Sequence, residues 1–201
     1  MATPKTAVAS KRKRNAKDKQ DAILSAALSL FVSHGFHGTA VPLVAKKAGV
    51  AAGTIYHYFD SKETLVNVLF RHWKGVIAQR IYTGFRPDSP PRDQFRAIWM
   101  SMAAFALENP EAFAFLEYHH HGSYLDAESR ALDRALKQFG EGFVVAAQKS
   151  GVVKDIAPVA LMELTFGAFN GMMRAHYDRR IALDDALIAR AEAATWDMLA
   201  T

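Results

Sequence analysis

Apolar residues recur every three or four positions through most of the chain, the spacing that places them on one face of an α-helix. Two such stripes are Ile23, Ala27, Leu30 and Phe31, and Leu65, Leu69, Trp73 and Ile77. No segment shows the apolar–polar alternation of a half-buried strand, and the chain has no internal sequence repeat. The pattern therefore predicts an all-α protein of about nine helices.

Glycine, proline and threonine positions set the ends of the first two helices. The first helix begins near Lys17 and ends at Gly35, which suits a left-handed C′ position. Thr39 is the predicted N-cap of a short second helix, because its hydroxyl can accept a hydrogen bond from the first turn. Pro42 falls in that first turn, where no backbone donor is lost, and Gly49 ends the helix.

Capping signals also place the remaining helices. A third short helix covers residues 52–58. Asp60 and Glu63 form a predicted capping box for a fourth helix, which fades before Gly84. The last five helices are predicted over residues 91–107, 110–119, 126–150, 158–177 and 184–199.

The stretch GTIYHYFDSKE, residues 53–63, places four aromatic rings in consecutive positions. A long helix followed by two short ones has the layout of a helix-turn-helix, whose second short helix enters the DNA major groove. On that helix Ile55 and Phe59 are four positions apart and share the inner face. An isolated tyrosine is usually a packed ring with a wet hydroxyl, but this layout favours DNA contact by the remaining positions. They are Gly53, Thr54, Tyr56, His57 and Tyr58.

Positive charge is concentrated in the first third of the chain. Residues 1–62 hold ten Lys or Arg and three Asp or Glu, whereas residues 63–201 hold fifteen and seventeen. Such an imbalance indicates a local contact with a polyanion. Residues 1–16 are predicted to be a disordered basic arm. It either follows the DNA backbone or enters a minor groove, or it is a solvated tail that raises affinity non-specifically. Its cations are Lys11, Arg12, Lys13 and Arg14.

Composition excludes several other classes of protein. The chain has no cysteine, which predicts a reducing cytoplasmic location and excludes disulfides and thiolate metal sites. No apolar run is long enough to span a bilayer, and the N-terminus lacks the apolar stretch of a signal peptide. Phosphate loops, dinucleotide fingerprints and the Gly-x-Ser-x-Gly motif are absent, so neither an enzyme nor a cofactor is predicted.

Residues 17–69 resemble the DNA-binding domain of the TetR family of transcriptional regulators. The match is carried by Ile23 to Ala27, Phe31, Gly35-Phe36, Thr39, Val44-Ala45, Ala48 to Val50, Gly53 to Phe59 and Ser61 to Glu63. The resemblance implies an all-helical homodimer with a helix-turn-helix over residues 17–63 and a ligand-binding and dimerisation domain over residues 64–201. It also implies that most members are repressors that ligand releases from DNA. The C-terminal part matches only in helix number and placement.

The resemblance also implies individual DNA contacts. Thr54, Tyr56, His57 and Tyr58 match the DNA-facing set of the family. Thr39 is expected to contact a phosphate through its hydroxyl and backbone donors, and Lys62 as a point charge. Ala51 and Ala52 depart from the family, which usually has a polar cap and a longer side chain there. Ala52 offers a base only its methyl group, so DNA shape is expected to contribute to sequence preference.

The last two long helices are the predicted dimer interface. Gly167 and Gly171 are small residues four apart, which permit close approach of another helix. Completion of the monomer core is the alternative, and the family resemblance favours the dimer. The interface residues are Leu164, Ala168, Gly171, Met172, Ala175, Leu187, Ala191, Ala194 and Met198.

Residues 95–124 are rich in aromatic side chains, which belong either to the core or to an effector cavity. No Lys or Arg lies between Ala97 and Ala127, so the expected effector is neutral or cationic, hydrophobic and often aromatic. The adjacent His119, His120 and His121 cannot all chelate one ion from a regular helix, so a metal is disfavoured against a polar pocket wall or a solvated helix end. The predicted ligand-binding residues are Phe95, Trp99, Met102, Phe115, Tyr118, His119 and Tyr124.

These observations predict a homodimeric regulator that binds a near-palindromic operator in double-stranded DNA and leaves it when a small effector binds. Activation instead of repression, or a metal as the signal, are alternatives within the same fold. An architectural DNA-binding protein that uses only the basic arm is a further alternative. That alternative leaves the aromatic C-terminal domain without a role.

Overall fold

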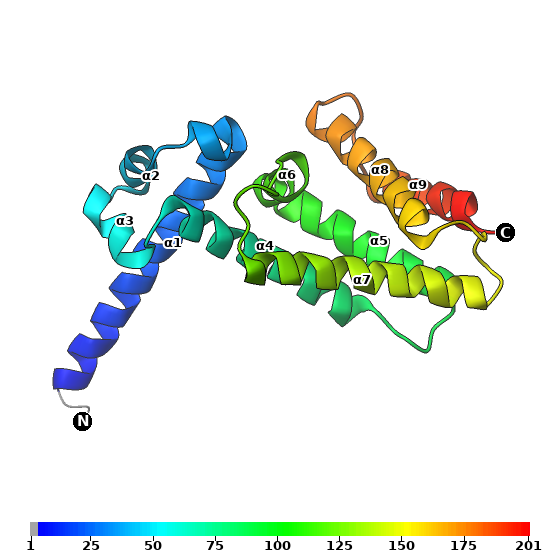
Figure 1. Ribbon diagram of the computed structural model, residues 1–201, viewed down its shortest axis with the longest axis horizontal. Helices are drawn as coiled ribbons and strands as arrows, with labels where there is room; N and C mark the ends of the chain where they lie inside the picture. The colour runs from blue at the N-terminus through cyan, green and yellow to red at the C-terminus, as the bar shows by residue number, and fades with distance from the viewer. Residues whose placement is uncertain (1–3) are drawn as a thin grey trace. The chain divides into compact units, whose positions relative to one another are not determined.

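The computed structural model describes the backbone of residues 4–201 and the side chains of residues 16–201. This part of the chain contains nine helices and no strand, which confirms the all-α prediction (Figure 1). Within it, no helix combines the length and hydropathy that crossing a bilayer requires. The helices are α1 (Pro4–Gly38), α2 (Val41–Ala48), α3 (Ala52–Tyr58), α4 (Lys62–Gly84), α5 (Pro91–Glu108), α6 (Pro110–Tyr118), α7 (Ala127–Lys149), α8 (Pro158–Tyr177) and α9 (Asp185–Leu199).

Helix α1 begins earlier than the apolar pattern indicated. Its backbone is helical from Pro4, whereas an irregular arm up to residue 16 and a start near Lys17 were expected. The helix is interrupted at Gly35, with φ 69° and ψ 173°, and a further turn runs to Gly38. Glycine is favoured at this positive φ, as expected, although ψ is extended rather than left-handed. The contacts predicted for Lys11, Arg12, Lys13 and Arg14 fall on side chains outside the described residues.

Two predicted N-caps are wrong by one residue. The cap position of α2 is Ala40, which has no side-chain acceptor, and not Thr39. At the start of α4, the Ser61 hydroxyl accepts a hydrogen bond from the Thr64 N–H at 3.0 Å, so Ser61 and not Asp60 caps the helix. In both cases a short polar side chain lay within one residue of the true end, where sequence signals separate neighbouring positions poorly.

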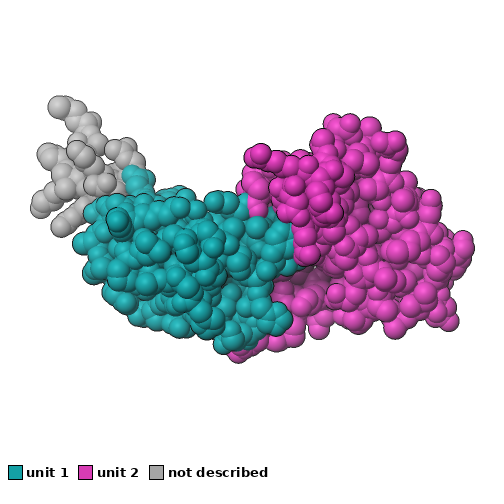
Figure 2. Space-filling model, turned by 90° about the horizontal axis from the view of Figure 1, so that it is seen from above, with its two compact units in different colours: residues 1–73, 111–126 teal, residues 74–110, 127–201 magenta. Residues whose placement is uncertain are grey.

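The described chain divides into two compact units (Figure 2). The first contains the residues up to Trp73 together with Glu111–Asp126, and the second contains Lys74–Pro110 together with Ala127–Thr201. The sequence predicted a single boundary between residues 63 and 64. The division differs because α6 and the connection after it pack within the first unit, a contact between segments far apart in sequence.

Aromatic rings join α1 to the α6 segment in the core of the first unit. The rings of Phe31 and Phe115 have centroids 6.3 Å apart, and those of Phe36 and Tyr124 are stacked at 4.2 Å. Packing of both pairs removes apolar surface from water, and this removal is the dominant favourable contribution to folding. The helix-turn-helix segments contribute the buried residues Ile23, Ala27, Leu30, Val41, Val44, Ala45, Ile55 and Phe59.

The second unit is a bundle of α5, α7, α8 and α9 with the last turns of α4, and α8 and α9 lie side by side (Figure 1). The buried ring of Trp99 meets Phe169 edge-on, with centroids 5.1 Å apart. Both carboxylate oxygens of the buried Glu192 accept hydrogen bonds from the Arg92 guanidinium, and that hydrogen bonding raises the pKa of Arg92. This two-point pair fixes α5 against α9.

Candidate nucleic-acid interface and interior cavity

Helices α2 and α3 are joined by a tight glycine turn. Gly49 has φ 67° and ψ 31°, a left-handed conformation that confirms its predicted place at the end of α2. The Val50 N–H donates to the Ala45 carbonyl at 3.0 Å and closes the helix end. Helix α3 then starts from Ala51, an N-cap without a side-chain hydrogen bond. The start of α3 is therefore formed without a hydrogen bond from a capping side chain.

The seven residues of α3 and the Phe59 that follows divide between two faces. Ile55 is 1% exposed and Phe59 is 2% exposed, which matches the predicted inner pair. Tyr56 is 54% exposed, so its hydroxyl and ring are accessible to a partner. The other outer positions are the exposed Ala52, Gly53 and His57 and the half-buried Thr54 and Tyr58.

Two lysines of α2 belong to the same unit as α3 and were missed by the sequence prediction. Lys46 and Lys47 are both exposed in the last turn of α2. The Lys47 ammonium donates to the Ser29 hydroxyl at 2.7 Å, which ties its side chain to α1. The available signal was their position, because they are the only Lys or Arg residues between positions 20 and 61. Exposed cations beside a helix-turn-helix are suited to phosphate contacts.

Thr39 serves the interior of the first unit. Its side chain is 0% exposed. Its hydroxyl donates to the Leu30 carbonyl at 3.1 Å and to the Gly35 carbonyl at 2.8 Å. Its N–H lies 3.4 Å from the Phe36 carbonyl oxygen and donates to it. These bonds satisfy carbonyls left open by the interruption of α1. A phosphate contact by Thr39, as the sequence predicted, requires that they break.

Lys62 is also bound within the first unit. Its ammonium donates to the Phe36 carbonyl at 2.9 Å and to the Thr39 carbonyl at 3.2 Å. It also lies 4.2 Å from the centroid of the Phe36 ring, a cation–π contact. Lysine has three donor hydrogens, so one remains for the predicted phosphate. The structure thus adds an internal role that the sequence did not reveal.

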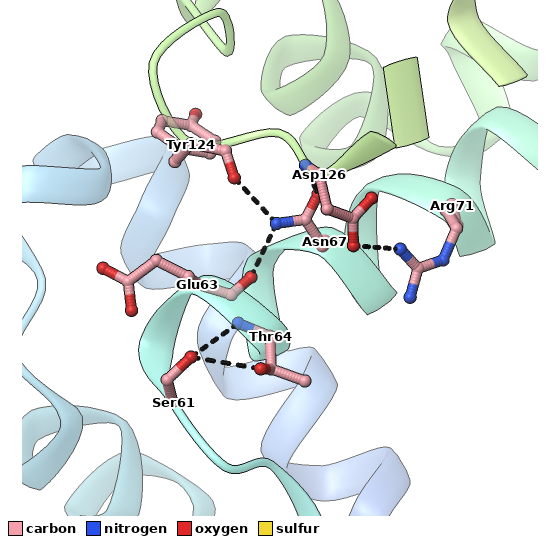
Figure 3. A network of polar contacts seen from close by, with 7 residues as sticks. All are labelled: Ser61, Glu63, Thr64, Asn67, Arg71, Tyr124 and Asp126. Atoms are coloured by element: carbon pink, nitrogen blue, oxygen red, sulfur yellow. Dashed lines mark hydrogen bonds and ion pairs between the residues drawn. The ribbon is translucent and has the colours of Figure 1, made fainter. Parts of the chain in front are cut away.

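Asn67 connects α4 to the segment after α6 (Figure 3). Its amide nitrogen donates to the carbonyls of Glu63 and Tyr124, each at 2.8 Å, and its amide oxygen accepts from the Asp126 N–H at 2.9 Å. Arg71 reinforces the same connection through an ion pair of 2.7 Å with Asp126. Asn67 is 2% exposed and was missed, although a lone amide in the apolar run from Leu65 to Leu69 was the signal available.

The three histidines after α6 have different environments. His120 is exposed and His119 is half-buried, whereas His121 is buried. The His121 Nε2 lies 2.6 Å from the Phe115 carbonyl oxygen, which only accepts, so Nε2 carries the proton and Nδ1 accepts from the Tyr124 hydroxyl at 2.7 Å. Burial raises the pKa of Tyr124 to about 12, which keeps that hydroxyl protonated. Among the described residues no group of three or more potential ligands is placed to hold a metal.

The second unit contains a partly open cavity of about 70 Å³. Its walls come from α5, α7, α8 and the end of α9. Thr165 is the one lining residue with a polar side chain, and its hydroxyl donates to the Leu161 carbonyl at 2.8 Å. The lining residues are Phe95, Ile98, Met102, Gly140, Phe143, Val144, Met162, Thr165, Phe166 and Leu199. The cavity therefore presents hydrocarbon surface to any occupant.

The predicted ligand-binding residues are divided between the two units. Phe95, Trp99 and Met102 belong to the second, and Phe115, Tyr118, His119 and Tyr124 belong to the first. Phe95 and Met102 line the cavity, whereas Trp99 is buried against Phe169 and does not line it. The cavity residues on α7 and α8 were missed, because their apolar side chains carry no signal that separates them from ordinary core.

The outer face of α8 is unusually apolar for an exposed surface. Leu164 is 50% exposed, and Ala168 and Gly171 are also exposed. A Cβ added to Gly171 meets nothing within 4 Å, so this glycine is not required by packing inside the chain. Of the other residues predicted for the dimer interface, Ala194 and Met198 are exposed, and Met172, Ala175, Leu187 and Ala191 are half-buried.

Two family models match the chain. "Bacterial regulatory proteins, tetR family" matches residues 23–74, and "Tetracyclin repressor-like, C-terminal domain" matches residues 70–201. The second match alone covers more than half of the chain. The chain belongs to the TetR family of bacterial transcriptional regulators. The predictions of a helix-turn-helix DNA-binding regulator, and of a protein that is not an enzyme, are thereby confirmed.

Curated regulators are similar to part of this chain. The HTH-type transcriptional regulator RutR of Escherichia coli K12 is 46% identical over 81 residues, 40% of this chain and 38% of RutR. A fatty acid metabolism regulator protein of Bacillus subtilis 168 is 32% identical over 76 residues, 38% of this chain and 39% of that protein. Each of these matches spans less than two fifths of the curated relative.

A solved structure resembles this TetR-family regulator over nearly its whole length. The crystal structure of a TetR family transcription regulator from Marinobacter aquaeolei VT8 has a TM-score of 0.82 at 25% identity. The match covers 94% of this chain and 98% of the other. The fold of both units is therefore that of the family.

Proposed function

We propose that this TetR-family regulator is a homodimeric repressor of a near-palindromic operator. In this proposal each subunit places α3 in the major groove, and the two grooves are one helical turn of DNA apart. The observation that carries it is the division of α3: Ile55 and Phe59 hold the helix from inside, while Tyr56 and His57 stay exposed. The proposal also includes the cytoplasmic location that was predicted from the lack of cysteine.

The apolar outer face of α8 supports the dimer. Leu164, Ala168 and Gly171 expose small or apolar surface. At Gly171, an added Cβ meets nothing within 4 Å among the described residues. Helices α8 and α9 of both subunits form a four-helix interface in this proposal, and burial of that surface supplies the driving force.

The second part of the proposal is release from DNA by a small hydrophobic effector that is neutral or cationic. The apolar cavity of the second unit supports it, because a pocket with hydrocarbon walls favours apolar ligands. An effector acts by binding one of two states of the dimer more tightly and shifting the population toward it. Activation by the bound effector is the alternative outcome of the same shift in population.

A footprint on the DNA upstream of the gene itself tests the proposal. We expect one bounded protected region with two-fold symmetry, and protection that disappears when effector is added. Uniform protection along the fragment would instead indicate an architectural protein. Protection that appears only with effector would replace repression by activation.

A further inference from the structure

The cavity of the second unit has an unusual lack of polar groups for a ligand site. Phe95, Ile98 and Met102 on α5 face Phe143 on α7 and Met162 and Phe166 on α8. Ordinary ligand pockets add a few polar groups that fix orientation. Here the one hydroxyl, on Thr165, is already used by the Leu161 carbonyl. An ionised group inside the cavity would lose its hydration without a counter-charge or hydrogen bond.

The size of the cavity limits what fits without movement. The cavity measures about 70 Å³, which is more than one water requires. Cavities lined by apolar side chains bind small hydrocarbons, and one of about 150 Å³ holds benzene. Met102 and Met162 in its wall have flexible unbranched side chains, so the walls adapt to shape without a backbone shift.

Gly140 on α7 preserves part of this space. A Cβ at Gly140 would lie 3.0 Å from the terminal methyl of Met162 and 3.4 Å from its sulfur. A side chain there therefore displaces Met162 or fills the cavity directly. Gly142, two residues along the same helix, is exposed, and a Cβ there meets nothing within 4 Å. The two glycines form a matched pair for substitution.

We propose that this cavity binds a short uncharged hydrocarbon group, either a single aromatic ring or a short alkyl chain, with movement of the methionine side chains in its wall. The inference rests on the proposed effector response and names the chemistry of the effector. Such a group has two possible sources. It is either a whole neutral molecule, as proposed above, or the tail of an anionic amphiphile whose head lies outside the cavity, an outcome that would replace the neutral or cationic effector.

Calorimetric titration of the full-length protein without DNA measures binding directly. The probes are the straight-chain alcohols from 1-butanol to 1-octanol, with hexanoate and hexanoyl-CoA for comparison with 1-hexanol. We expect affinity to rise by about three- to fourfold per methylene, until the chain fills the cavity, and then to level off. Binding should carry a negative heat-capacity change, the mark of apolar burial.

Substitution of the two glycines then locates the site. We expect Gly140→Leu to weaken 1-hexanol binding at least tenfold and Gly140→Ala to weaken it severalfold, while Gly142→Leu and Gly142→Ala stay within twofold of the parent. The alanine variants guard against misfolding, because alanine favours the helix over glycine and disturbs only the flexible end of Met162. Equal affinities in the Gly140 and Gly142 variants would overturn the proposal, as would affinity independent of chain length.

The ligand comparison separates the two sources. Tighter binding of 1-hexanol than of hexanoate and hexanoyl-CoA identifies a neutral molecule, and tighter hexanoyl-CoA binding that Gly140→Leu abolishes identifies a tail. Hexanoyl-CoA binding that Gly140→Leu leaves unchanged would overturn the assignment to this cavity. Operator binding, measured separately by fluorescence anisotropy, keeps the outcomes distinct. Cavity binding without an effect on operator affinity contradicts the proposed effector response and leaves the site intact.

Discussion

At the scale of single residues, a threonine hydroxyl and a lysine ammonium that the sequence predicted to contact DNA form hydrogen bonds inside the first unit. Thr39 and Lys62 both act where α1 ends, around Gly35 and Phe36. That end has carbonyls without helical partners, and a buried carbonyl without a donor is costly. Tyr56 contrasts with them, because its side chain is exposed and no hydrogen bond within the described residues engages its hydroxyl.

Replacement of Lys62 by alanine should destabilise the protein by roughly 1–3 kcal/mol, because two carbonyls lose a charged donor. Chemical denaturation measures this loss, and Lys46→Ala is the control because Lys46 is exposed. The Lys62→Ala variant also tests the predicted phosphate contact of Lys62. A log–log salt slope of operator binding that flattens by about one unit supports it, and an unchanged slope removes Lys62 from the phosphate set.

Tyr56→Phe should weaken operator binding by roughly 1–2 kcal/mol, since it removes only a hydroxyl able to bond a phosphate. Thermal melting should be unchanged because the ring of Tyr56 is exposed. Tyr82→Phe is the matched control, an exposed tyrosine of the second unit. Normal operator affinity combined with a lowered melting temperature would show that Tyr56 is a packing residue.

The buried Tyr124 predicts a change of stability at high pH. Burial raises its pKa to about 12, above the ordinary value of about 10. Its contribution to stability is therefore complete below pH 10 and is lost as the pH rises through 12. Tyr124→Phe should cost about 1 kcal/mol at neutral pH, through the lost bond to His121, and this difference from the parent should shrink between pH 10 and 12. A constant difference across that range, in urea titrations, would contradict the prediction.

At the scale of elements, α6 and the connection after it belong with the helix-turn-helix unit. The rings of Phe115 and Tyr124 pack on Phe31 and Phe36, and Asn67 holds the connection through two hydrogen bonds. These bonds join residues more than fifty positions apart, so they order a segment that lies between helices of the second unit in sequence.

Asn67→Leu should destabilise the first unit by roughly 1–3 kcal/mol, because it leaves the Tyr124 carbonyl and the Asp126 N–H without their partner. Hydrogen exchange of the Asp126 amide should accelerate more than that of other amides in the first unit. The control is Gln79→Ala, whose exposed bond to Thr83 lies in the second unit. Unchanged protection at Asp126 would show that its amide does not depend on Asn67.

At the scale of the whole molecule, the proposed function depends on a second copy of the chain. The exposed face of α8 is the surface proposed for it, and Gly171 tests that proposal because a Cβ added there meets nothing within 4 Å. Gly171→Leu should therefore leave the subunit folded but weaken the dimer, because two helices can no longer approach closely. Analytical ultracentrifugation measures this, with Gly142→Leu as the control. A dimer as tight as the parent would exclude this part of α8 from the interface.

The sequence by itself determined the features that depend on neighbours along the chain. The helical period predicted about nine helices and the inner pair Ile55 and Phe59. The glycines at positions 35 and 49 predicted turns with positive φ. The segment that begins at Asp184 predicted the last helix, and the Asp184 carboxylate accepts a hydrogen bond from the Leu187 N–H. Each of these follows from backbone geometry and side-chain direction over one or two turns. Residues 17–69 also carried enough of the family pattern to indicate a DNA-binding regulator.

Only the tertiary structure decided which distant residues meet. Lys62 bonds a carbonyl 26 positions away, and Asn67 bonds one 57 positions away. The assignment of α6 to the first unit and the cavity among α5, α7 and α8 arise in the same way. An apolar stripe shows that a helix face is buried, but it does not specify the partner that buries it. Helix packing makes that choice, and with it the division of the predicted ligand residues between two units.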